Sequence, residues 1–179
     1  FISGNDTPVI WRGPLVSRMT EQFFKDVDWG ELDFLILDLP PGTGDVQLTL
    51  TQKLRISGAI IVTTPQDIAL SDVRKGADMF EKVKTPILGV IENMSGFMID
   101  GVIKSSNGEI LSHGEINLSD GSIIQISEIG NFEIKIDLFK KGGGETESKR
   151  LNIPLLGQIP ISNDIVVSTD NGTPIVHKA

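Results

Sequence analysis

The chain has 179 residues, of which 39% are hydrophobic and 22% are charged, a composition typical of one compact domain or part of a larger one. Its formal charge of −8 argues against a broad surface for nucleic acid or anionic membrane, since both partners require clustered Lys and Arg. No apolar run approaches the roughly 20 residues that cross a bilayer. The lack of cysteine excludes disulfides and thiolate metal ligands within these residues.

Helical periodicity is found in three segments of the first half. Apolar residues recur at four-residue spacing from Leu15 to Val27, and Pro14 suits the first helical turn. The same spacing follows Asp45, a candidate N-cap. A third apolar face extends from Leu70 to Val83. These segments predict three helices.

Apolar runs at residues 33–38, 58–65 and 86–93 predict strands that are buried on both faces, and 154–160 predicts a weaker fourth strand. The strands alternate with the predicted helices, which favours right-handed crossovers. A short helix is also predicted after Ser162, ending near Asn171. The predicted fold class is therefore α/β, with a doubly wound, mostly parallel sheet.

The pattern changes at residues 98–138, where turn dipeptides separate short alternating segments. Asn107-Gly108, Asp120-Gly121 and Gly130-Asn131 are signals for small antiparallel hairpins. We therefore predict a β-rich insertion at 98–138 within an α/β domain formed by 1–97 and 139–179.

Polar residues at the predicted strand ends suggest a ligand site, because ligands of open parallel sheets bind at the carboxyl ends of the strands. Asp38 could hold Mg²⁺ through water beside a nucleotide phosphate. Gly42 could bring a backbone N–H close to a terminal phosphate. On spacing alone, an Asp38 that merely caps a turn is an equally good interpretation.

Four segments, "DLPPGTGDVQLTL", "GAIIVTTPQDIAL", "KGADMFEKV" and "PILGVIENMSGF", resemble the second half of the Mrp/ApbC family. Members of this family are P-loop ATPases related to MinD and ParA that act as iron–sulfur cluster carriers. The flanking "TPVIWRGPLV", "DVDWGELD" and "LLGQIPI" fit the same family. The resemblance covers most of the chain outside 98–138.

The resemblance implies a partial P-loop NTPase fold and a set of site residues. Asp38 would be the catalytic acid that organises Mg²⁺ and the attacking water. Pro40, Gly42 and Gly44 would belong to the loop that senses the terminal phosphate of ATP. Asn93 would bind the adenine, and the segment around Pro160 would line the base pocket. From the residues alone, Asn93 would be interpreted as a turn that closes a strand.

The sequence departs from the family pattern at two places. It contains no Gly-Lys pair and hence no P-loop, and it begins at Phe1 without methionine, so we expect that a preceding segment was removed. The glycine-rich "KKGGGETES" at 140–148 is interpreted as a flexible connection rather than a phosphate cradle. The second departure is the lack of the Cys-x-x-Cys pair that bridges a cluster between subunits in many members. Two isolated histidines, His113 and His177, cannot complete a typical metal site.

These observations predict the C-terminal part of a cytoplasmic, ATP-hydrolysing iron–sulfur cluster carrier that is inactive without an upstream P-loop. The expected cofactors are ATP and Mg²⁺, whereas cluster binding by this cysteine-free chain is doubtful. The expected partners are a second copy and iron–sulfur client or assembly proteins, with no nucleic acid and no membrane. The alternatives are a non-catalytic interaction module and a partitioning ATPase of the MinD/ParA type.

Overall fold

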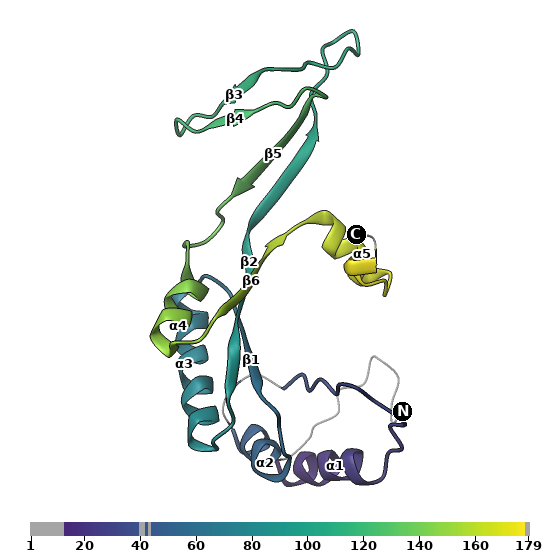
Figure 1. The fold of residues 1–179 in the computed structure, drawn as a ribbon, viewed down its shortest axis with the longest axis vertical. Helices are drawn as coiled ribbons and strands as arrows, with labels where there is room; N and C mark the ends of the chain where they lie inside the picture. Colours follow the sequence, from purple (N-terminus) through teal and green to yellow (C-terminus); the bar gives the residue numbers. More distant parts are fainter. Residues whose placement is uncertain (1–12, 40–41, 43, 178–179) are drawn as a thin grey trace. The chain divides into compact units, whose positions relative to one another are not determined.

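The computed structural model describes residues 13–39, 42 and 44–177. In chain order these residues form α1 (Gly13–Lys25), α2 (Asp45–Lys53), β1 (Ala59–Thr63), α3 (Asp67–Lys82), β2 (Ile87–Val102), β3 (Glu115–Asn117), β4 (Ile123–Gln125), β5 (Asn131–Ile136), α4 (Gly143–Leu151), β6 (Leu155–Ile161), α5 (Asn163–Asp170) and the 3₁₀ helix η1 (Ile175–His177) (Figure 1). This alternation confirms the predicted α/β class. The predicted helices at α1, α2, α3 and α5 are also confirmed.

The main sheet has the strand order β1–β2–β5, and β6 also pairs with β2. The β2–β6 pair is parallel, with Val90 opposite Leu155 and Asn93 opposite Ile159. The β2–β5 pair is antiparallel and is contributed by the predicted insertion. The strands predicted at 58–65, 86–93 and 154–160 are therefore present.

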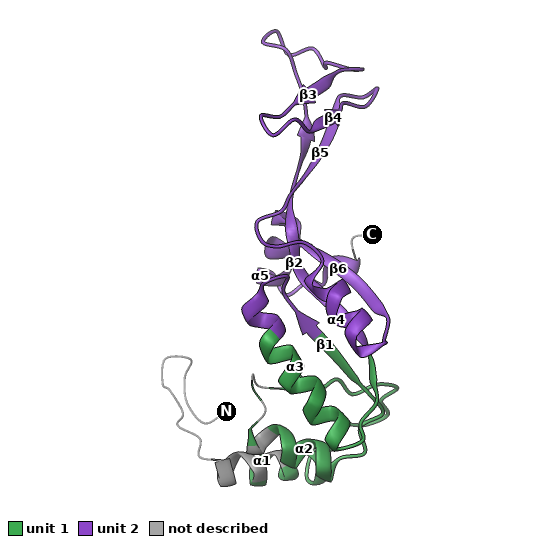
Figure 2. Cartoon of the chain, turned by 90° about the vertical axis from the view of Figure 1, so that its left-hand side faces the viewer, with its two compact units in different colours: residues 1–61, 71–88 green, residues 62–70, 89–179 purple. Residues whose placement is uncertain are grey.

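The chain divides into two compact units (Figure 2). Unit 1 contains residues 1–61 and 71–88, and unit 2 contains residues 62–70 and 89–179. In unit 1, the ammonium of Lys53 in α2 lies 3.1 Å from the carboxylate of Glu21 in α1. The whole segment 98–138 lies within unit 2, and its boundaries as a separate insertion stay a prediction.

Two glycines make room for leucines of neighbouring segments. In unit 1, a Cβ built on Gly58 would lie 2.5 Å from Cγ of Leu88. In unit 2, a Cβ built on Gly89 would lie 2.5 Å from Cγ of Leu156. Separations this short cannot be accommodated without a shift, so neither glycine can gain a side chain while its leucine stays in place.

The strand predicted at 33–38 is not formed. The segment is irregular, and Phe34 and Ile36 are 87% and 89% exposed. An apolar run becomes a strand only where a neighbouring strand satisfies its backbone groups, and no strand among the described residues pairs with this one. The predicted N-cap is also displaced by one residue, because Gly44, not Asp45, occupies that position.

The segment 98–138 is β-rich, as predicted, but β2 extends into it as far as Val102. The Asp120-Gly121 turn joins β3 and β4, and the Asp120 carboxylate accepts hydrogen bonds from the backbone N–H and the hydroxyl of Ser122 at 2.9 and 2.5 Å. The short helix predicted after Ser162 is α5, and the Ser162 hydroxyl caps it by accepting a hydrogen bond from the N–H of Ile165.

Candidate functional site

Asp38 and the loop behind it lie in unit 1. The Asp38 side chain is exposed and has no hydrogen-bond or ion-pair partner among the described residues. Gly42 has a φ of +100°, a conformation that favours glycine, and a Cβ built there meets nothing closer than 4.0 Å. Gly44 caps α2. An exposed carboxylate is a ligand of the kind that magnesium prefers. Pro40 lies outside the described residues.

Gln47 is a residue of this loop region that the sequence interpretation missed. Its side chain is only 5% exposed, and its amide lies 3.5 Å from a Cβ built on Gly44. Its backbone carbonyl accepts a hydrogen bond from the buried Thr51 hydroxyl at 2.9 Å. A polar residue in the first turn of a helix that follows a glycine-rich loop could have drawn attention to it. Gln47 therefore borders the loop from the helix side.

Asn93 and Pro160 lie in unit 2 on the neighbouring strands β2 and β6. Asn93 is opposite Ile159, so the two predicted base-binding positions are one residue apart in register. The Asn93 Oδ1 accepts a hydrogen bond from the N–H of Met94 at 2.9 Å, which leaves the Nδ2 amide without a partner in the described part of the chain. Both residues are half-buried. The pair presents a free amide donor of the kind that a purine base can accept.

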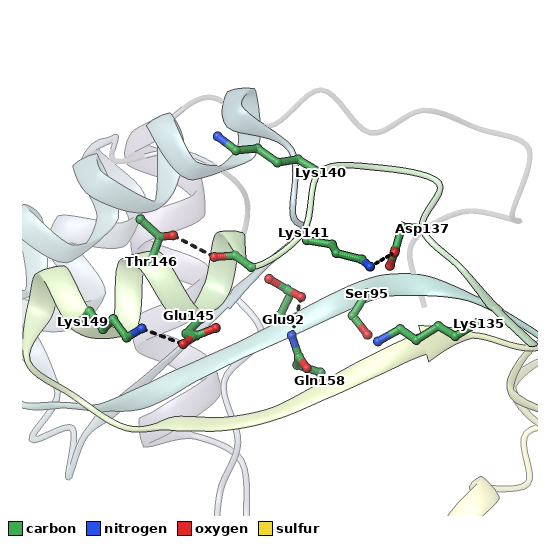
Figure 3. A pocket seen from close by; sticks show the side chains of 11 residues that line it. Glu92, Ser95, Lys135, Asp137, Lys140, Lys141, Glu145, Thr146, Lys149 and Gln158 are labelled. Atoms are coloured by element: carbon green, nitrogen blue, oxygen red, sulfur yellow. Dashed lines mark hydrogen bonds and ion pairs between the residues drawn. The ribbon is translucent and has the colours of Figure 1, made fainter. Parts of the chain in front are cut away.

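The most buried polar group beside Asn93 is Glu92, which is 2% exposed. Its carboxylate accepts a hydrogen bond from the backbone N–H of Gly144 at 2.6 Å. It also accepts one from the Gln158 amide at 2.8 Å (Figure 3). Gly144 is in the first turn of α4, where a carboxylate compensates both the unpaired N–H groups and the helix dipole. An acid within an apolar run, as in "PILGVIEN", is the signal that could have identified Glu92.

A pocket of about 590 Å³ beside Glu92 is lined by four lysines, and three of them are engaged in ion pairs. Lys141 lies 2.7 Å from Asp137, whose hydrogen bond raises the pKa of Lys141. Lys149 lies 2.7 Å from Glu145, and its hydrogen bond lowers the pKa of that carboxyl group. Two of the four lysine charges are therefore compensated by carboxylates that also line the pocket (Figure 3).

The glycine-rich segment at 140–148, interpreted as a flexible connection, is only partly a loop, because α4 begins at Gly143. A Cβ built on Gly143 would lie 2.9 Å from the backbone of Pro65, so the glycine permits close backbone packing. The helix was missed because its first residues are glycine and its apolar face is short. The Glu92 carboxylate already accepts the N–H of Gly144, so the start of α4 offers no open cradle for phosphate.

No group of three or more His, Cys, Asp or Glu side chains that could hold a metal ion occurs among residues 13–39, 42 and 44–177. The 179 residues contain no cysteine, so they offer no thiolate ligand for a metal ion or cluster. No helix in the described part is long and apolar enough to cross a membrane.

An α/β chain with an exposed aspartate, a glycine-containing loop behind it and an asparagine amide without a partner among the described residues has the features of a nucleotide-binding class of protein. A family model described as ParA, NUBPL iron-transfer P-loop NTPase, matches residues 1–118. The chain belongs to this family.

The curated relatives include iron-sulfur cluster carrier proteins of Synechocystis sp., 43% identical over 98% of this chain and 42% of the relative, and of Escherichia coli, 38% identical over 98% and 40%. The iron-sulfur cluster transfer protein NUBPL of Dictyostelium discoideum is 38% identical over 98% of this chain and 45% of its own. The chain thus spans about half the length of the curated relatives that it matches.

A similar solved structure is a nucleotide-binding protein from Archaeoglobus fulgidus in complex with ADP. It is 31% identical, with a TM-score of 0.61 over 88% of this chain and 53% of that chain. The likeness agrees with the α/β class seen here and with the family match.

Proposed function

We propose that the intact protein is an ATP-hydrolysing iron–sulfur cluster carrier and that this chain supplies part of its nucleotide site. The observation that carries the proposal is the family match over residues 1–118, which includes Asp38, the loop behind it and Asn93. The cluster is the cargo of the protein, and client or assembly proteins receive it. The relatives named as iron-sulfur cluster carrier and transfer proteins support this assignment.

In this proposal Asp38 holds Mg²⁺ through water and orients the attacking water molecule. Gly42 and Gly44, with Pro40, form the loop that responds to the terminal phosphate. Asn93 donates a hydrogen bond to the adenine from its free amide, and the segment around Pro160 lines the base pocket. The free Asp38 carboxylate and the unpartnered Asn93 amide support these roles.

The proposal is tested with Asp38→Asn in the intact protein. The amide removes the charge that organises Mg²⁺ and water, whereas contacts to the base survive. We expect turnover to fall by about a hundredfold or more. The affinity for ATP should change by less than about threefold, because contacts to the base contribute equally to the ground state and to the transition state.

The matched control is Asp33→Asn, which makes the same change at an exposed position of the same segment. Wild-type turnover is expected in the control. Equal turnover in wild type and Asp38→Asn would reject the role of Asp38. A loss of the same size in both variants would show that the segment tolerates neither change and would also reject a specific role.

A further inference from the structure

A groove of about 690 Å³ lies in the part of unit 2 formed by residues 98–138. It is lined by consecutive residues of β2, β4 and β5, among them Asp100, Val102, Ile123, Gln125, Phe132 and Glu133. Val102 and Ile123 are 47% and 56% exposed. The walls therefore combine apolar side chains with two carboxylates.

The groove is bordered by strand edges. The Ser127–Asn131 turn lies between β4 and β5. Because β4 pairs with β3 whereas β5 pairs with β2, β4 and β5 diverge (Figure 1). β4 and β5 each have one edge without a strand neighbour among the described residues. Three successive residues of each of β2, β4 and β5 line the groove, so it runs along the paired ends of β2 and β5 and beside β4. Such edges accept an extended chain as an added strand.

Asp100 and Glu133 face each other directly across the β2–β5 pair. Like charges at directly opposite positions are unfavourable in a sheet. Both carboxylates are exposed, and neither has a hydrogen-bond or ion-pair partner in the part of the chain that the structure describes. Lys135 is two residues beyond Glu133 in β5, but its stem covers Gly96 and its side chain lines the pocket beside Glu92. No described residue therefore compensates the two charges directly.

The charge of the surrounding segment has the same sign. Residues 98–138 contain seven acidic side chains and two lysines, a formal charge of −5 out of −8 for the whole chain. This charge repels a second copy of the same segment, and it equally repels nucleic acid and anionic lipid. A segment with basic side chains on an extended backbone satisfies both the carboxylates and the open strand edges.

We propose that this groove binds an extended, basic segment of a partner protein, which adds as a strand beside β4 or β5 and places lysine or arginine side chains at Asp100 and Glu133. The partner is a different protein, not a second copy. The proposal goes beyond nucleotide hydrolysis and does not depend on it.

The test is fluorescence anisotropy with the full chain and a labelled heptapeptide of alternating lysine and valine, beside a heptapeptide of alternating glutamate and valine. Wild type is compared with Asp100→Asn/Glu133→Gln, which keeps the shape and removes the unfavourable pair of like charges. The matched control is Glu109→Gln/Glu128→Gln, which removes the same charge at exposed positions that do not line the groove. Urea unfolding should show that the groove variant is no less stable than wild type.

We expect the lysine peptide to bind wild type about tenfold or more tightly than the glutamate peptide, and the groove variant to lose about tenfold in affinity. The control should lose less than about twofold. In wild type, amide NMR shifts on adding the lysine peptide should concentrate at residues 123–125 and 131–133. Absent binding, equal losses in both variants, or shifts elsewhere would overturn the proposal. Light scattering that shows a dimer lost only in the groove variant would identify a second copy as the occupant and would equally overturn it.

Discussion

The carboxylate of Glu92 in β2 accepts a hydrogen bond from the backbone N–H of Gly144 at 2.6 Å, although 52 residues separate them. This contact joins a buried strand to the first turn of α4. The other carboxylate oxygen is held by the Gln158 amide in β6. One side chain thus fixes a helix and a neighbouring strand at once.

Replacing Glu92 by Leu should destabilise the protein, because it leaves a buried backbone N–H and an amide without their acceptor. We expect the free energy of unfolding to fall by about 1–3 kcal/mol. Glu92→Gln should cost less, since its amide oxygen can still accept one hydrogen bond. Urea unfolding followed by circular dichroism measures both. Glu128→Gln, at an exposed position, is the control and should change stability by less than about 0.5 kcal/mol. A Leu variant as stable as this control would contradict the role of Glu92.

Gly143→Ala should also be destabilising, because the added Cβ would lie 2.9 Å from Cα and the carbonyl oxygen of Pro65. Backbone atoms cannot rotate away as a flexible side chain can, so the segments must separate. We expect a loss of about 1–3 kcal/mol. Gly157→Ala is the matched change, since a Cβ there meets nothing within 4 Å. Thermal unfolding that ranks the two variants equally would show that the packing at Gly143 has no energetic weight.

The Ser122 hydroxyl, followed by the Ser122 backbone N–H, lowers the pKa of Asp120 below its ordinary value. A carboxyl group whose pKa is lowered on folding contributes stability above its unfolded pKa, roughly pH 4, and loses it as pH falls through the folded pKa. Ser122→Ala removes the hydroxyl and keeps the backbone N–H. NMR titration of the Asp120 carboxyl carbon should show a pKa closer to the ordinary value in the variant. An unchanged titration curve would reject the hydroxyl as the main cause.

The 179 residues alone should not hydrolyse ATP appreciably, because the lysine and loop N–H groups of a P-loop supply much of the stabilisation of the transition state. The sequence contains no Gly-Lys pair. Phosphate release by the purified chain is the measurement, with Asp38→Ala as the comparison. Turnover by the purified chain that is lost in Asp38→Ala would show that these 179 residues contain the phosphate site, and it would contradict the expectation.

Segment 98–138 should not ligate an iron–sulfur cluster, because cluster iron normally requires thiolates and the chain has none. The test is anaerobic reconstitution with iron and sulfide, desalting and absorbance spectroscopy. A variant with 98–138 replaced by a short Gly-Ser linker serves as the comparison. We expect no stable cluster spectrum in either protein. A stoichiometric spectrum that is lost only in the deletion would show that the segment holds the cluster.

Much of the fold could be predicted because the signals are local. The apolar periodicity of α3 and the start of α5 after Ser162 depend on residues close in sequence, and both predicted helices are confirmed. The prediction of a strand at 33–38 was wrong, because strand formation depends on neighbouring strands that periodicity does not reveal. Helix α4 was missed because glycine and polar residues hide an element that tertiary contacts stabilise.

The candidate site was predictable to a different degree. Family resemblance pointed to Asp38 and Asn93, and their roles stay predictions. Gln47 and Glu92 were missed because each is polar yet buried, and burial depends on the packing of distant segments. The sequence shows only that Glu92 is a charged residue within an apolar run.

The fit of Leu88 over Gly58, and of Leu156 over Gly89, links the evolution of these positions. A Cβ at either glycine would lie 2.5 Å from the leucine Cγ, so the leucine must shift or be shortened, and a Cβ at Gly89 would also lie 2.8 Å from the backbone carbonyl oxygen of Pro154. Gly58 and Leu88 should therefore vary together among homologous chains, with a larger residue at the glycine accompanied by a smaller one at the leucine, whereas a larger residue at Gly89 also requires a shift of the backbone at Pro154. The two pairs form separate contacts, so each can change without the other.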